Sequence, residues 1–83
     1  MGRPVKRSLT LKGHRTSVTL EDEFWQAFRE IAAEKSRAIN DLASEIDNER
    51  GLESGLASAI RLYVLAHYRS DIAHRRKSGD MLR

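Results

Sequence analysis

His14-Arg15-Thr16-Ser17-Val18-Thr19-Leu20 is the stretch that decides the fold, because it reads as one β-strand and passes without a loop into a helical pattern that begins near Glu21. A lone strand leaves a row of unpaired amides and carbonyls, so it needs a partner strand. We see no second convincing strand and no internal repeat in the chain. The segment therefore predicts that two copies pair their strands into an antiparallel ribbon.

A small core also favours association of two chains. The chain has 83 residues, which is enough for one domain with a limited apolar interior. It contains no cysteine, so no disulfide framework compensates for that size. We expect a homodimer whose core includes inward residues of the strand and apolar residues of the helices: Thr16, Val18, Leu20, Phe24, Phe28, Ile31, Leu42 and Ile46.

Three helices are expected after the strand. Apolar residues at helical spacing predict the first helix from Glu21 to about Lys35 and the second from Ile39 to about Asn48. The third is predicted from about Glu53 to at least Tyr68. Its two sides are both apolar, because Leu62 and Leu65 lie away from its main apolar face, which is typical of a helix buried between partners.

The two ends of the chain are rich in positive charge. The net charge is +3, but the first twenty residues carry five basic side chains and no acidic one. We interpret residues 1–13 as a basic arm, residues 14–69 as the folded domain and residues 70–83 as a charged tail. This separation of charge suits a polyanionic partner such as nucleic acid.

The order of strand, helix, short turn and helix over residues 14–48 resembles the ribbon-helix-helix DNA-binding proteins. The opening residues 7–11 and 13–21, together with Leu56, Arg61 and Tyr68, are similar to a bacterial subgroup that adds a third helix. The resemblance implies a mainly α-helical fold with one short strand per chain and an intermolecular ribbon. It also implies a homodimeric DNA-binding regulator of transcription, most simply a repressor, located in the cytoplasm with the nucleoid.

Alternate residues on the strand face opposite sides, which separates a core set from an outward set. The resemblance assigns base contacts to the outward residues Arg15, Ser17 and Thr19. Such side chains suit a major groove, where arginine binds guanine and hydroxyl groups adapt to several bases. In the family the start of the second helix holds a phosphate, and the basic arm adds further contacts. The expected phosphate-contacting residues are Arg37, Ile39, Asn40, Lys12 and Arg7.

Other functions receive less support from the residues. We find no pairing of nucleophile and base and no phosphate-binding loop, so we expect no enzyme activity and no cofactor. His67 and His74 lack further ligands at a compact spacing, so no metal site is expected. Apolar runs are too short for a membrane span, and no membrane partner is expected.

Two alternatives remain open. The ribbon could serve only dimerisation in an antitoxin or protein-interaction module, with a protein partner held by the third helix or the tail. The ribbon could also bind DNA with little sequence specificity, as a nucleoid protein does. Neither composition nor spacing separates these alternatives from an operator-binding regulator.

Overall fold

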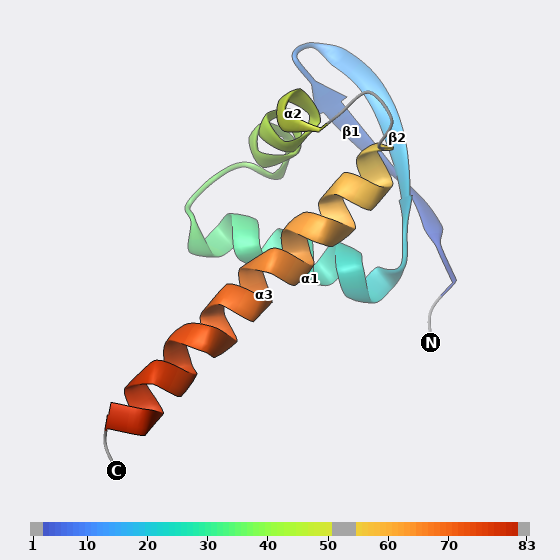
Figure 1. Cartoon of the computed structure of the whole chain (residues 1–83). Helices are drawn as coiled ribbons and strands as arrows, with labels where there is room; N and C mark the ends of the chain where they lie inside the picture. The colour runs from blue at the N-terminus through green and yellow to red at the C-terminus, as the bar shows by residue number, and fades with distance from the viewer. Residues whose placement is uncertain (1–2, 51–54, 82–83) are drawn as a thin grey trace.

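A computed structural model shows a β-hairpin supported by three helices (Figure 1). The structure describes residues 3–50 and 55–81, and side chains as far as residue 73. The elements are β1 (Val5–Leu11), β2 (His14–Leu20), α1 (Asp22–Glu34), α2 (Ile39–Glu49) and α3 (Leu56–Met81). The expectation of a mainly helical chain with three helices is confirmed, although the predicted start of the third helix at Glu53 lies outside the described residues.

The ribbon is formed within one chain, which corrects the prediction of an intermolecular ribbon with a single strand per chain. β1 pairs with β2 in antiparallel register, with Ser8 opposite Ser17 at the middle of the ladder. Lys12 and Gly13 make the turn with φ of 53° and 81°. Positive φ at both central residues is the geometry that suits the twist of a two-residue hairpin, and glycine adopts it without strain.

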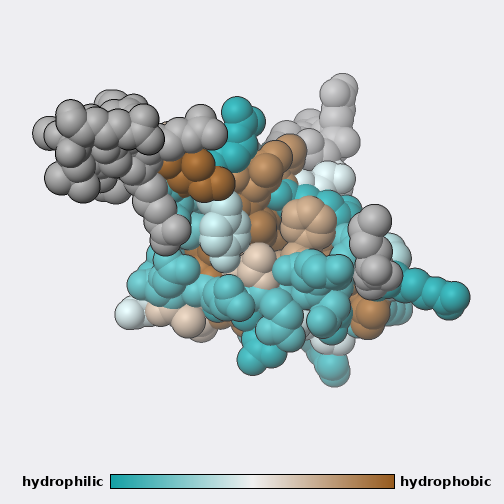
Figure 2. Space-filling model, turned by 90° about the horizontal axis from the view of Figure 1, so that it is seen from below, coloured by the Kyte–Doolittle hydropathy of each residue, from teal (hydrophilic) through white to brown (hydrophobic). Residues whose placement is uncertain are grey.

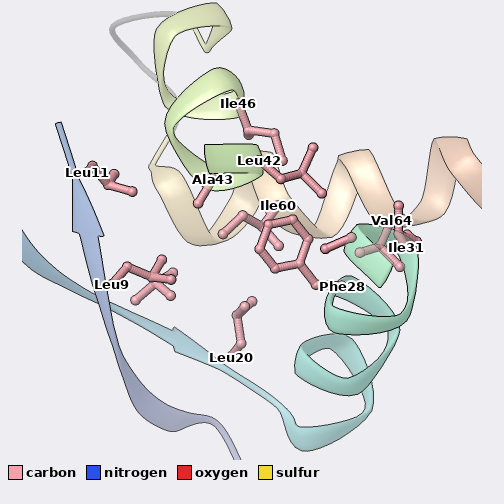
Figure 3. Packing of buried hydrophobic residues seen from close by; sticks show 12 residues of the cluster. Leu9, Leu11, Leu20, Phe28, Ile31, Leu42, Ala43, Ile46, Ile60 and Val64 are labelled. Carbon is pink, nitrogen blue, oxygen red and sulfur yellow. The ribbon is translucent and has the colours of Figure 1, made fainter. Parts of the chain in front are cut away.

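Residues 5–11 therefore belong to the folded domain and not to a basic arm. Leu9 and Leu11 of β1 are buried together with Val18 and Leu20 of β2. They close one side of a core that α1, α2 and α3 complete, with Phe28, Leu42 and Ile60 at its centre (Figure 3). The hairpin thus brings its own second strand to the position for which we had expected a partner's strand.

The end of the chain also differs from the prediction. α3 extends to Met81, whereas we had expected a charged tail over residues 70–83. Its first half packs on α1 and α2, and its second half projects beyond the rest of the domain (Figure 1).

The break between α1 and α2 is a tight reversal with a strained residue. Ser36 has φ of 54°, and the amides of Ser36 and Arg37 donate to the carbonyls of Ala33 and Ala32 at 3.0 and 2.9 Å. These two bonds form a Schellman motif, in which glycine is the usual residue at the left-handed position. Serine pays a steric penalty there because of its Cβ.

We therefore expect Ser36→Gly to raise the free energy of unfolding by about 1 kcal/mol. Denaturant titration monitored by circular dichroism measures the change. Ser70→Gly is the matched control, since the same substitution in the helical body of α3 should destabilise by about 0.5–1 kcal/mol. A loss of stability in Ser36→Gly would show that the reversal does not require the left-handed conformation.

Candidate nucleic-acid interface

The outer face of the hairpin is a polar surface built from both strands. Because directly opposite residues share a face, the ladder places three cross-strand pairs on this side. All six side chains are exposed. The outer-face residues, which form the pairs Lys6–Thr19, Ser8–Ser17 and Thr10–Arg15, comprise two cations and four hydroxyl groups.

Half of this surface was predicted from the sequence. Arg15, Ser17 and Thr19 lie on the outer face of β2 and are exposed, as the alternation of the strand had suggested. Lys6, Ser8 and Thr10 were missed because β1 was interpreted as an arm. The signal that would have found them is a repeat nine residues apart, in which Ser8-Leu9-Thr10-Leu11 matches Ser17-Val18-Thr19-Leu20.

α2 lies along the outer edge of β1. The Thr10 amide donates to Asn40 Oδ1 at 3.1 Å, and Lys12 Nζ donates to Asn48 Oδ1 at 2.5 Å. These bonds hold the first and last turns of α2 beside β1 and give an edge amide a partner. The start of α2 is thereby placed next to the polar outer face.

The start of α2 has free backbone amides. Its first helical bond runs from the Leu42 amide to the Ala38 carbonyl, so the amides of Ile39 and Asn40 have no partner inside the helix. Ala38 occupies the N-cap position and provides no side-chain cap. Arg37 is ion-paired with Glu45, and the Asn40 side chain accepts the bond from Thr10. The backbone amides are therefore available to bind an anion, and the side-chain amino group of Asn40 is not used by its bond to Thr10.

Arg7 does not face outward with the predicted phosphate contacts. It lies on the inner face opposite Val18, and its side chain is only 19% exposed. Its guanidinium lies 5.5 Å from the centroid of the Trp25 ring, and Nη2 is 3.3 Å from Asp22 Oδ1. These contacts join β1 to α1, so the structure gives Arg7 a supporting role in place of the predicted phosphate contact.

Most of the predicted core residues are buried, and one is exposed. Val18, Leu20, Phe28, Ile31, Leu42 and Ile46 are buried, and Phe24 is half-buried. Thr16 is exposed, since it lies near the turn opposite Leu9, where β1 and not β2 supplies the buried side chain. All of these positions are filled within one chain.

The junction between β2 and α1 is clamped to α3. Arg61 donates from Nε and Nη2 to Glu21 Oε1 at 3.0 and 2.9 Å, and its Nη2 also lies 3.4 Å from the Thr19 carbonyl. The guanidinium lies 5.8 Å from the centroid of the Phe24 ring. Arg61 thus supports the end of the strand that carries Thr19 on its outer face.

Hydrogen bonding lowers the pKa of Glu21 below its ordinary value of 4.5, first from its own backbone and then from Arg61. A carboxyl whose pKa is lowered by folding contributes stability above its unfolded pKa and loses that contribution as the pH falls through the folded pKa. We therefore expect Glu21→Gln to flatten part of the acid-induced loss of stability, measured as the unfolding free energy between about pH 6 and pH 3.

Arg61→Met should flatten part of the same pH dependence, because it removes one cause of the lowered pKa. Adding Glu21→Gln to Arg61→Met should then remove only what the backbone hydrogen bond contributes. A pH dependence identical to that of the wild type in both single variants would contradict the clamp.

Comparison with known proteins identifies the class. The sequence matches the family described as "Ribbon-helix-helix domain" over residues 4–68, most of the chain, so the chain belongs to this family. Ribbon-helix-helix proteins are non-catalytic DNA-binding proteins that act as dimers, typically as regulators or antitoxins. Searches of curated proteins and of solved structures returned no match.

Two further findings concern the described residues alone. Within residues 3–50 and 55–81, no group of three His, Cys, Asp or Glu side chains is arranged to hold a metal ion. No helix in the same part of the chain is both long and apolar enough to cross a membrane.

Proposed function

We propose that the protein is a sequence-specific transcriptional regulator, most simply a repressor, which inserts the outer face of its hairpin into the major groove of DNA. The observation that carries this proposal is the exposure of all six outer-face side chains on a ribbon whose inner side is anchored in the core. A two-stranded ribbon fits a major groove, and arginine, lysine, serine and threonine all bind base edges there. Such a role places the protein in the cytoplasm with the nucleoid.

The start of α2 is the proposed phosphate contact. Free amides and the positive end of a helix dipole attract anions, and contacts of this kind fix a protein on the duplex. The bond between Thr10 and Asn40 sets this helix end at a fixed distance from the ribbon. Lys12, in the turn, is the second proposed contact, although its ammonium group must leave Asn48 to reach a phosphate.

A homodimer remains part of the proposal, and because β2 already pairs with β1 of its own chain, we propose a contact outside the ribbon. We place it on α3, whose residues Leu62, Leu65 and Ile72 form an exposed apolar row, 62%, 51% and 51% exposed. This row lies opposite the buried Ile60 and Val64 on the same helix. Figure 2 shows brown apolar surface in the upper part of its view, above a largely hydrophilic lower part.

Replacing Leu62 and Leu65 together by glutamate is expected to give a monomer that retains its helical content, because both side chains are already exposed. Light scattering after size-exclusion chromatography measures the mass. Gln26 is exposed on α1 and not on α3, so Gln26→Glu is the control for added charge. An unchanged dimer in the double variant would place the contact elsewhere.

The proposed function is tested by competition binding. Purified protein is titrated against DNA from upstream of its own gene and against a scrambled duplex at several salt concentrations. We expect a large affinity ratio that persists as salt rises, because base contacts, unlike phosphate contacts, release few counterions. Equal and steeply salt-sensitive binding would indicate a weakly specific nucleoid protein, and no binding would favour a protein-interaction module such as an antitoxin.

A further inference from the structure

The outer face of the hairpin has an approximate local two-fold symmetry within one chain. β1 presents Lys6, Ser8 and Thr10, and β2 presents Arg15, Ser17 and Thr19, so a basic residue, a serine and a threonine occur in the same order on both strands. The register places Ser8 opposite Ser17. A two-fold axis through this central pair therefore exchanges each residue of β1 with its counterpart nine positions later.

The inner face repeats in the same way. The axis exchanges Leu9 with Val18 and Leu11 with Leu20, and all four side chains are buried. The symmetry is broken on the inner face where Val5 corresponds to His14 and Arg7 to Thr16, and on the outer face only where Lys6 corresponds to Arg15. One chain thus carries, within itself, nearly the surface that two identical strands related by symmetry would form.

We infer that the hairpin of a single chain is a complete DNA-recognition surface for a short, nearly palindromic element, with Lys6 and Arg15 contacting bases at its two ends. This inference rests on the proposed function. The serine pair lies over the middle of the element, and each threonine lies across the ribbon from the basic residue of the other strand.

The geometry also sets the size and the asymmetry of the element. From Lys6 to Thr10 the strand advances about 13 Å, which matches about four base pairs at 3.4 Å each. Arginine binds the two acceptors of guanine with a rigid fork, whereas lysine is a flexible point charge. The end of the element under Arg15 is therefore expected to tolerate base changes less than the end under Lys6.

Stoichiometry tests the first part of the inference. Native mass spectrometry is carried out on the full chain with excess duplex that carries one selected element. We expect the complex to contain equal numbers of chains and duplexes. A monomer gives a one-to-one complex, and a dimer with two ribbons gives two chains with two duplexes. Two chains on every single-element duplex would overturn the inference while leaving the proposed function intact.

Base preference tests the second part. Lys6→Ala should reduce discrimination at one end of the element by about 5-fold or more, and Arg15→Ala should reduce it at the other end by about 5- to 150-fold. The double variant Lys6→Arg with Arg15→Lys should exchange the strict and tolerant ends. Lys35→Ala, which removes an exposed lysine from the end of α1, is the matched control and should alter neither end.

The outcomes separate the two levels of the proposal. If Lys6→Ala weakens binding to specific and random duplexes equally while Arg15→Ala still alters base preference, β1 binds phosphates. That result overturns the inference that a single chain forms the complete recognition surface. If the wild type shows no base preference at all, the proposed function itself fails.

Discussion

Replacing Phe28 by alanine is expected to lower the free energy of unfolding by about 3–5 kcal/mol. The Phe28 side chain is fully buried, and its ring meets Tyr63 of α3 edge-on at a centroid distance of 6.4 Å. It also lies 6.4 Å from the Trp25 ring. Its removal leaves a cavity where α1, α3 and the hairpin meet, because surrounding residues of a close-packed core relax only in part.

Denaturant titration followed by tryptophan fluorescence measures this loss, and Phe24→Ala is the control on the same helix. Phe24 is half-buried, so its truncation should cost clearly less. A change of under about 1 kcal/mol for Phe28→Ala would show that the hairpin and the helices do not share one core.

Arg15→Ala is expected to weaken binding to the preferred duplex by about 1–3 kcal/mol while leaving binding to random DNA almost unchanged. Arg15 is exposed on the outer face opposite Thr10, and the fold does not depend on its side chain. Fluorescence anisotropy with both duplexes, at one fixed salt concentration, measures the two affinities.

Arg29→Ala is the matched control, since it removes the same charge from an exposed position on α1. It should change both affinities by a similar small amount. Equal losses on specific and random DNA for Arg15→Ala would make Arg15 a phosphate contact and would remove the strongest proposed base contact.

β2 and the three helices could be predicted from the sequence, whereas β1 could not. The periodicity of residues 14–20 correctly predicted β2 and the inward direction of Val18 and Leu20. Three helices were also predicted, and α2 begins at the expected Ile39. These features follow from local patterns, which is why one sequence was sufficient to find them.

The pairing of β1 with β2 was harder to recognise from the sequence than β2 or the helices. A two-residue turn with both φ angles positive usually carries asparagine or aspartate before glycine, whereas this chain has Lys12 before Gly13. Pro4, the only proline of the sequence, together with Gly2 and Gly13, further suggested an exposed arm. The pairing of β1 with β2 was therefore missed, and the strand was assigned to a partner chain.

The error in the position of Arg7 has a different origin. Its burial is stabilised by Trp25 and Asp22, which α1 brings to β1 from fifteen or more residues away in the sequence. Alternation within β1 would have placed Arg7 on the same face as Leu9, but burying a basic residue there is favourable only when a carboxylate and an aromatic ring are present. Those partners appear only when the helices are in place.

The most direct test of a ribbon built within one chain uses the absence of cysteine from the sequence. Ser8 and Ser17 lie opposite each other in the ladder. The Thr10 amide bonds to Asn40 and not to β2, so Thr10–Arg15 and, two residues along, Ser8–Ser17 are pairs without mutual backbone bonds, where Cα atoms are about 4.5 Å apart. This separation allows a disulfide.

We expect the double variant Ser8→Cys with Ser17→Cys, oxidised in dilute solution, to remain one chain in mass and to migrate as a monomer on a non-reducing gel. Ser17→Cys alone should not form a covalent dimer efficiently, because its neighbour across the ladder is Ser8 of the same chain. Rapid and complete dimer formation by Ser17→Cys alone, at the midpoint of the strand, would show that β2 pairs with its counterpart in a second chain and would contradict the single-chain ribbon.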